Sequence, residues 1–391
     1  MKKFFFYNII LLLLFLSLET LSYLATKFKL FRLNETPDIY RSKDFVDHSV
    51  WRNEKELWGA WHVNNKKTYH SSSCFSAVYE SNEIGARDKS FVNIKNDNKN
   101  IILLGDSMVE GYTVNYQDTV KYMLEKNLKV NVLNFASAMD FGPVQYFIIY
   151  KELAKKYSHQ AVIIFFLPQN DFTDNNYESF VSIRPESEKR RYRPYYKKIS
   201  EDDYEIFYPD KATKRDSFDI FNPSKNNSVR LFIKKYFYFN NLLTTIGITK
   251  YNIFNWNETR GIKSDILNDK IWYSGYQEKD IEKQKAAIFF IKEIIKEVSR
   301  DKKKVIIVSI PVLADIYQNK LNDKYKNNYW YQSLLNLNDK KNVFFIDLLE
   351  YSYINEPEKF YQWCDGHWTA LGNKFAADIV VNFINKESIL K

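Results

Sequence analysis

The central and C-terminal parts of the chain alternate between short apolar runs and amphipathic segments. The apolar runs are bounded by polar or turn residues and predict buried strands, whereas the segments between them carry apolar residues at helical spacing. This pattern predicts strands at 99–107, 130–137, 160–171, 303–311 and 342–349, and helices at 116–128, 143–157, 281–301, 328–338 and 369–384. Strands that are apolar throughout and alternate with helices indicate an α/β fold, a parallel sheet with helices on both faces.

Two stretches break this alternation. Residues 26–95 are polar and aromatic, and residues 177–278 are charged and aromatic, with a predicted hairpin at 188–210 and a predicted helix at 229–247. We expect the second stretch to be an inserted cap region that covers one edge of the sheet. The pattern therefore predicts four parts: an N-terminal segment at 1–25, an extension at 26–95, an α/β domain at 96–176 and 279–391, and the insertion at 177–278.

The N-terminal segment has the pattern of a membrane helix. Lys2 and Lys3 precede an apolar run from Phe4 to Leu18, and weaker apolar character continues to Ala25. A membrane-spanning helix needs roughly 20 apolar residues, so a cleaved signal peptide and an uncleaved transmembrane anchor both fit. No small-residue cleavage site follows, which favours the anchor. The two lysines favour an N-terminus inside, although basic residues also follow the helix.

Composition excludes several classes of function. The net charge of +9 is spread along the chain, so we treat it as background and expect no nucleic-acid partner. The sequence has no P-loop, no GxGxxG after a strand and no metal-ligand spacing, so we expect no cofactor and no metal. Cys74 and Cys364 would form one disulfide in an exported domain, and two unrelated buried thiols are the open alternative.

Candidate catalytic residues follow the predicted strands. "GDS", "NFASAMDFG" and "PQND" end three strands, and "CDGHWTALGN" precedes the last helix. Because the carboxyl ends of parallel strands meet at one sheet edge, these segments can form a site. Ester hydrolysis needs a hydroxyl nucleophile, a base, an acid that orients the base, and oxyanion donors. Ser107, His367 and Asp365 fit the first three roles. The Ser107 amide, a backbone amide near Gly142 and the Asn170 side chain fit the last.

In order, these four segments resemble the sequence blocks of the SGNH (GDSL-type) hydrolases. "GDSMVEG" matches the GDSxxxG pattern of the first block, and "NFASAMDFG", "QND" and "DGHWTALGN" follow in the family's order. The resemblance spans 96–176 and 279–391 and implies a flavodoxin-like three-layer α/β/α fold. Three departures are visible: Ala136 and Met139 lie where an early Gly is usual, Gln169 replaces a Gly, and Asp365 precedes His367 by two residues rather than three.

Other residues have competing interpretations. Asp347, at the end of a predicted strand, is a rival for the orienting acid, and we expect Asp106 and Asp171 to be structural. The run 189–198 fits a solvated loop better than a glycan-binding platform, and two tryptophans near the proposed base fit either sugar stacking or core packing (Trp363 and Trp368). We expect the remaining histidines to be ordinary surface or packing residues (His48, His62, His70 and His159).

The resemblance implies a serine ester hydrolase that acts outside the cytoplasm and removes O-acyl groups, such as acetyl, from a carbohydrate. An O-acetyltransferase of an envelope or secreted polysaccharide is an alternative, since a sugar hydroxyl could replace water. An envelope polysaccharide acyltransferase is a possible partner. A non-catalytic glycan-binding or assembly protein that retains the fold is a third possibility. Intact Ser107, Asp365 and His367 argue against this third interpretation.

Overall fold

The protein was analysed as a computed structural model, which describes most of the chain. The described residues are 2–28, 30, 37–40, 53–71, 74–94, 99–183, 191–209, 228–243, 280–319, 324–351, 356–363 and 365–390.

A five-stranded parallel sheet forms the centre of the molecule. Its strands are β5 (Ile101–Leu104), β6 (Val132–Asn134), β7 (Ala161–Phe166), β10 (Lys304–Ser309) and β11 (Val343–Asp347), in the order β11-β10-β7-β5-β6. Nearly every residue of these strands is buried, as their continuous apolar sequences require for a sheet covered on both faces. All five strands lie within the ranges predicted from sequence.

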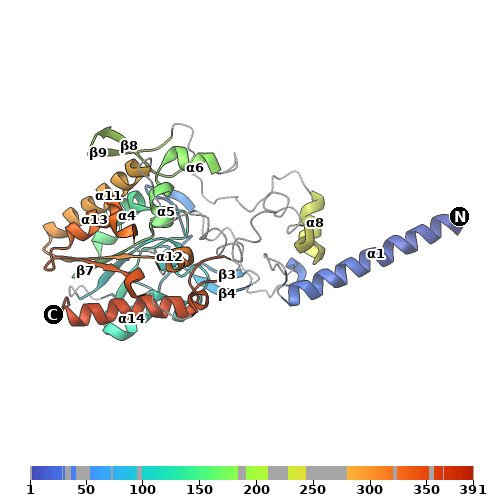
Figure 1. Cartoon of the computed structure of the whole chain (residues 1–391). Coiled ribbons are helices and arrows are strands. Elements are labelled where there is room, and N and C mark those ends of the chain that lie inside the picture. Colours follow the sequence, from blue (N-terminus) through green and yellow to red (C-terminus); the bar gives the residue numbers. More distant parts are fainter. Residues whose placement is uncertain are drawn as a thin grey trace.

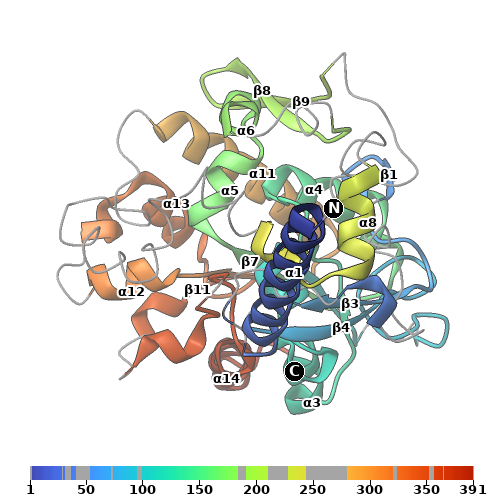
Figure 2. The ribbon, with the colours of Figure 1, turned by 90° about the vertical axis from the view of Figure 1, so that its right-hand side faces the viewer.

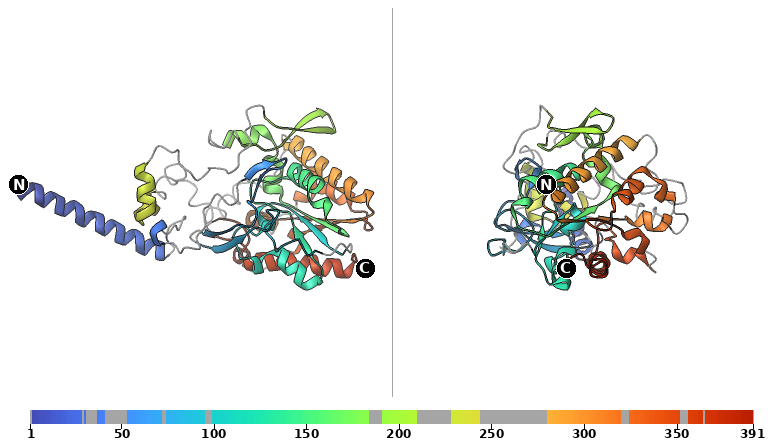
Figure 3. Two further views of the ribbon diagram at one scale, coloured as in Figure 1. Left: turned by 180° about the vertical axis from the view of Figure 1, so that it is seen from behind. Right: turned by 90° about the vertical axis from the view of Figure 1, so that its left-hand side faces the viewer.

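Helices cover both faces of this sheet (Figure 1). On one face, α14 (Ala370–Lys386) packs against α3 (Val120–Leu128). On the other, α11 (Ile281–Arg300) packs against α4 (Pro143–Glu152) and α13 (Tyr329–Leu337). The right-hand view of Figure 3 shows the two helical layers above and below the strands. The structure confirms the predicted α/β class.

The strand order fixes where a site can form. From β5 the chain moves outward to β6 and then returns to β7 on the other side of β5; Ile101 pairs with Val132 of β6 and Ala161 of β7. This is the flavodoxin-like order, in which strands are first added on one side of β5 and then on the other, so that the order reverses between β5 and β7. The loops that leave β5 and β7 therefore diverge at their carboxyl ends and leave room for a site between them.

The N-terminal extension packs into the same core. It contains two antiparallel hairpins, which the sequence pattern did not predict: β1 (Asn53–Glu56) with β2 (Gly59–Trp61), and β3 (Lys67–Ser71) with β4 (Ser76–Glu80). Trp58, Trp61 and Phe91 are buried in the main hydrophobic core. The extension is therefore part of the structural support of the sheet.

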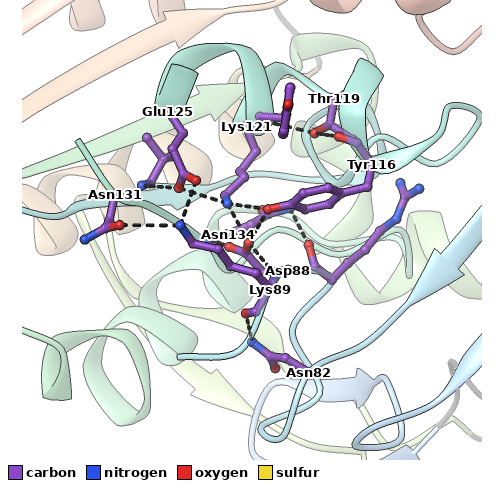
Figure 4. A network of polar contacts seen from close by, with 12 residues as sticks. Asn82, Asp88, Lys89, Tyr116, Thr119, Lys121, Glu125, Asn131 and Asn134 are labelled. Atoms are coloured by element: carbon purple, nitrogen blue, oxygen red, sulfur yellow. Dashed lines mark hydrogen bonds and ion pairs between the residues drawn. The ribbon is translucent and has the colours of Figure 1, made fainter. Parts of the chain in front are cut away.

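A buried polar network joins this extension to α3 and β6 (Figure 4). Lys121 Nζ lies 2.6 Å from Asp88 Oδ1, and both side chains are almost completely buried. The other carboxylate oxygen of Asp88 accepts a hydrogen bond from the Asn134 amide at 2.9 Å. Tyr116 donates its hydroxyl to Asp88 at 3.0 Å. These contacts satisfy a charge pair that would otherwise be costly to bury.

The insertion contains the predicted hairpin, β8 (Tyr195–Ser200) with β9 (Asp203–Phe207). It packs against α11: the ring centroids of Tyr204 and Phe289 are 5.3 Å apart, and Lys198 Nζ lies 2.6 Å from a Glu282 carboxylate oxygen. The hairpin thus covers a helix of the outer layer, and the expected cover of a sheet edge by the insertion stays a prediction. The predicted helix at 229–247 is observed as α8 (Ser228–Tyr236), and parts of the insertion lie outside the described residues.

The N-terminal helix α1 (Lys2–Lys27) projects away from the sheet (Figure 1) and points toward the viewer in Figure 2. It is long and apolar enough to cross a membrane, as a transmembrane anchor or a signal sequence would be. The remaining short helices are η1 (Asp38–Tyr40), α2 (Ser107–Glu110), η3 (Tyr116–Asp118), η4 (Ala154–Lys156), α5 (Pro168–Asp174), α6 (Tyr177–Ile183), α12 (Leu313–Asn319), η6 (Lys324–Asn327), η7 (Leu348–Tyr351) and η8 (Pro357–Phe360).

Candidate active site

Ser107 lies at a tight corner between β5 and the single helical turn α2. The side chain of Asp106 accepts a hydrogen bond from the Met108 amide at 3.0 Å and caps this turn. A side chain on Gly105 would come within 2.7 Å of Val109, so the corner requires glycine. The corner holds the partly exposed Ser107 at the carboxyl end of the sheet.

His367 comes from a short loop before α14 and reaches Ser107. Its Nε2 lies 2.6 Å from Ser107 Oγ, and its Nδ1 is hydrogen-bonded to Asp365. The loop is a compact turn: the Gly366 amide donates to the Gln362 carbonyl at 2.7 Å, and Gly366 has a left-handed φ of +89°. Ser107, His367 and Asp365 therefore form a continuous hydrogen-bonded chain, so the structure brings these three candidates together, and their catalytic roles stay a prediction.

A second contact fastens this loop to the segment after α2. Thr113 Oγ1 donates a hydrogen bond to the Trp368 carbonyl at 2.9 Å, and both residues are buried. Thr113 follows Ser107 by six residues, and Trp368 follows His367 directly. The nucleophile candidate and the base candidate are thus held on two segments that are bonded to each other.

The surrounding carboxylates favour a protonated His367. Burial lowers the pKa of the imidazole, but the charge and hydrogen bond of Asp365 outweigh it, with smaller contributions from Asp106 and Glu110. The net pKa of His367 is raised above its ordinary value. For Asp365, burial raises the pKa, but His367 overcomes this effect and lowers the pKa overall. A raised pKa of His367 beside an ionised Asp365 suits an imidazole that must accept a proton and hold it.

Asn170 lies on the other side of the site, in α5 after β7. Its Nδ2 donates a hydrogen bond to Asp106 Oδ2 at 3.2 Å. An amide nitrogen carries two protons, and this hydrogen bond uses one of them. Burial raises the pKa of Asp106, although the charge of His367 and the hydrogen bonds that Asp106 accepts oppose this rise. Asp106 therefore connects the Ser107 corner to Asn170, which agrees with the structural role expected for it.

The backbone donor proposed at Gly142 is already used. The Gly142 amide donates to Gln145 Oε1 at 3.2 Å, and Gly142 is the N-cap residue of α4. A side chain at Gly142 would meet Asn175 Oδ1 at 2.5 Å, which explains the glycine by close packing. The Ala136 and Ser137 amides also donate, to Asn134 and to the Gly105 carbonyl.

Asp347 and Asp171 serve other parts of the fold. Asp347 accepts hydrogen bonds from Ser309 at 2.8 Å and from the Tyr325 hydroxyl at 2.7 Å, and neither contact involves His367. Asp171 accepts from the Leu167 amide at 2.8 Å and so braces the turn after β7, as expected. Asp365 is therefore the carboxylate that bonds His367.

Sequence reasoning missed a buried cluster on the helical turn that begins at Ser107. Glu110, three residues later in α2, has a fully buried side chain that lies 2.5 Å from His62 Nε2. Its other oxygen accepts a hydrogen bond from the Ala138 amide in the loop after β6. His62 Nδ1 is bonded to the Gly85 carbonyl at 2.9 Å. His62 is buried, which fits the packing alternative given above, and its place in the aromatic segment "WGAWHV" is the signal that the sequence offers for this pair.

Aromatic side chains line one side of the candidate base. The ring centroids of Tyr112 and His367 are 5.0 Å apart. The ring centroid of Tyr112 also lies 4.1 Å from that of His70. His70 comes from β3, so the N-terminal extension borders the site. Trp368 is buried in the core, whereas Trp363 is 55% exposed. Of the two tryptophans, Trp363 is available to contact a ligand.

The basic run at 189–198 is not a solvated loop where it is described. Arg191 and Arg193 are both almost completely buried. Arg191 lies 2.8 Å from Asp140 Oδ2, and Arg193 donates to the Asp140 and Asp174 carbonyls at 2.7 Å. Asp140 has a left-handed φ of +57° and lies in the loop after β6. These arginines therefore brace that loop, which is why they are buried.

Two further predictions can be placed only in part. Cys364 and His48 lie outside the described residues, so the disulfide between Cys74 and Cys364 stays a prediction.

His159 is buried and bonded to the Tyr150 hydroxyl at 3.1 Å, and burial lowers its pKa to about 4. Within the described ranges, no group of three or more His, Cys, Asp or Glu residues could hold a metal ion.

Comparisons with known proteins give matches at the level of structure. No protein-family model and no curated protein sequence matches the chain. A protein described as lipolytic and of the G-D-S-L family, from Desulfitobacterium hafniense, is 11% identical with a TM-score of 0.36, covering 73% of this chain and 99% of its own. A GDSL-like lipase from Bacteroides thetaiotaomicron is 10% identical with a TM-score of 0.35, covering 76% and 92%.

A carbohydrate esterase family 2 enzyme with a carbohydrate-binding domain, from Corynascus thermopiles (Myceliophthora fergusii), is 11% identical with a TM-score of 0.36. That alignment covers 74% of this chain and 66% of the other. All these similarities are distant, and the fold class rests on the strand order of the sheet itself.

Proposed function

We propose that this chain is a serine ester hydrolase of the SGNH type, with Ser107 as nucleophile, His367 as base and Asp365 as the acid that orients it. The observation that carries the proposal is the hydrogen-bonded chain from Ser107 Oγ to His367 Nε2, at 2.6 Å, and from His367 Nδ1 to Asp365. A serine hydroxyl is a weak nucleophile by itself, and a base in direct contact removes its proton during attack.

In the first half-reaction, Ser107 Oγ attacks the ester carbonyl while His367 takes the hydroxyl proton. The negative charge that develops on the carbonyl oxygen needs preorganised donors. The Ser107 amide at the start of α2 and the Asn170 side chain are two such donors. We assign the third donor to a backbone amide of the loop after β6, in which the amides of Ala136, Ser137, Ala138 and Gly142 make hydrogen bonds within the protein. His367 then returns the proton to the leaving alcohol, and an acyl-serine remains.

In the second half-reaction, water replaces the alcohol. His367 removes a proton from the attacking water, and the same donors hold the second oxyanion. Collapse releases the carboxylic acid, and the proton held by His367 returns to Ser107 Oγ. If a sugar hydroxyl attacked in place of water, the product would be a new ester and the protein would be an O-acyltransferase.

As substrate we propose an O-acylated carbohydrate, with acetyl as the acyl group, located outside the cytoplasm. The exposed Trp363, four residues before His367, offers an aromatic face of the kind that packs on sugar rings. The apolar helix α1 and its N-terminal lysines support an anchored domain beyond the membrane. The Asp-x-His spacing resembles that of membrane-associated members that act on polysaccharide acetyl groups.

The test is turnover of p-nitrophenyl acetate by the full-length chain in detergent. We expect Ser107→Ala to lower kcat by roughly 10³-fold or more, because the acyl-serine cannot form. Ser182→Ala, at an exposed serine in α6, is the matched control and should keep full activity. A wild-type rate no higher than that of Ser107→Ala would overturn the proposal. With an acetylated oligosaccharide and an unmodified acceptor present, free acetate indicates hydrolysis, and an acetylated acceptor indicates transfer.

A further inference from the structure

One face of α1 is covered by protein although the rest of the helix is exposed. The covered positions lie three or four residues apart, so they share one side of the helix. Ser22 and Thr26 are buried, and Phe15, Leu18 and Glu19 are partly buried. The segment that covers them is 237–241 of the insertion, which follows α8.

Polar contacts fix this interface. The Glu19 carboxylate accepts hydrogen bonds from the Tyr238 amide at 2.7 Å and from the Phe239 amide at 2.9 Å. About two helical turns further along α1, Asn241 Nδ2 donates to Thr26 Oγ1 at 2.7 Å, and both side chains are buried. An acidic side chain near an apolar helix is costly unless its oxygens are bonded, and here they are.

Aromatic contacts extend the same interface along α1. Phe15 meets Phe237 with ring centroids 5.2 Å apart, and Tyr23 meets Tyr238 at 5.0 Å. Tyr238 also stacks on Tyr40 of η1 at 5.6 Å. Insertion and N-terminal chain thus meet around the C-terminal half of α1, where the strict apolar run has just ended at Leu18.

The elements around this end of α1 expose apolar side chains to the outside. Val229 is 65% exposed and Phe232 is 55% exposed, both on α8, and Ile39 and Tyr40 of η1 and Phe28 after α1 are also exposed. We call these five residues the collar. α8 packs against η1 and runs across the direction of α1 (Figure 1). Its sequence, SVRLFIKKY, combines apolar residues with one arginine and two lysines.

We propose that the collar is a lipid-contact surface. It lies at the boundary between headgroups and acyl chains, on the same side of the membrane as the catalytic domain. A helix that lies across a membrane span, with apolar residues exposed beside basic ones, has the composition of an interfacial helix. Exposed apolar clusters on a folded surface mark a binding partner, and the adjoining helix α1 makes that partner the bilayer. The proposal rests on α1 as a retained anchor; cleavage would remove the partner of segment 237–241.

The test is photo-crosslinking of the full-length chain in vesicles of phosphatidylethanolamine and phosphatidylglycerol. p-Benzoylphenylalanine is placed at Phe232, at Leu11 on the exposed part of α1, and at Leu335, an exposed leucine of the distant helix α13. We expect lipid adducts by mass spectrometry at positions 232 and 11, at least about tenfold above position 335, since an interfacial helix buries its apolar face in lipid.

Each other outcome overturns the proposal. A lipid adduct at position 11 without one at 232 would show that α1 is inserted while the collar stays in water. A crosslink from 232 to a second copy of the chain would make the collar a protein interface. Absence of adducts at both positions would show that α1 is not inserted, and the proposal would fall with its premise. None of these outcomes depends on esterase activity, so the proposed function is tested separately.

Discussion

His62 Nε2 lies 2.5 Å from the Glu110 carboxylate, and Glu110 is three residues from Ser107 on the same helical turn. Glu110 also accepts a hydrogen bond from the Ala138 amide. One buried carboxylate thus joins three parts of the protein: the N-terminal extension, the Ser107 corner and the loop after β6. That loop is also the one to which we assign an oxyanion donor, so the pair is placed to set the position of that donor.

Glu110→Gln should therefore lower kcat for p-nitrophenyl acetate by about tenfold while KM changes by less than about twofold, because a shifted oxyanion donor acts on the transition state. The measurement is steady-state kinetics of the full-length chain. Glu293→Gln, on α11, is the control. A lower Tm with unchanged kcat would show that Glu110 stabilises the fold without positioning the site.

Asp365→Asn tests the coupling between Asp365 and His367 through pH. The base acts in its neutral form, so kcat/KM rises with pH through the pKa of His367. Because Asp365 raises that pKa, the acid limb of the wild type should have its midpoint above the ordinary histidine value of 6.5. Removing the carboxylate charge should move the midpoint to lower pH and reduce kcat by roughly 10²–10⁴-fold. Asp378→Asn on α14 should leave the profile in place, and an unshifted limb in Asp365→Asn would contradict the assignment.

Lys121→Met tests the buried network of Figure 4. It leaves the Asp88 carboxylate without its buried countercharge and should lower the free energy of unfolding by about 3–5 kcal/mol. Burial already raises the pKa of Asp88, and Lys121 is the main group that opposes this shift. Adding Asp88→Asn should recover part of the loss, whereas Lys126→Met on the exposed side of α3 should change little. Urea unfolding is the measurement, and a loss below about 1 kcal/mol for Lys121→Met would reject this role.

The predicted disulfide between Cys74 and Cys364 is tested on protein purified without reductant. We expect no alkylation of either cysteine until the protein is reduced, and a decrease in stability of about 2–5 kcal/mol after reduction. Cys74 lies just before β4, and Cys364 directly precedes Asp365, so the bond would tie the extension to the loop of the candidate base. Two thiols that react freely in the native protein would defeat the prediction.

The sequence by itself determined the sheet, its helices and the candidate residues. Buried parallel strands are apolar throughout and amphipathic helices repeat at 3.6 residues, so local composition identifies both. Ser107, Asn170, Asp365 and His367 were visible because each follows a predicted strand or precedes a predicted helix in an ordered set of blocks. The predicted hairpin at 188–210 was visible for a similar local reason, as two apolar-polar runs around a charged turn.

Only the tertiary structure decided which groups meet. The Glu110–His62 pair, the buried Arg191 and Arg193, and the contact of segment 237–241 with α1 each join residues from distant segments, and no local pattern encodes such a pairing. Whether the Gly142 amide is free depends likewise on what folds against it, and in the structure it donates to Gln145. Burial and hydrogen-bond partners are properties of the packed chain, so the sequence names the reactive groups and the fold decides which of them are placed to act.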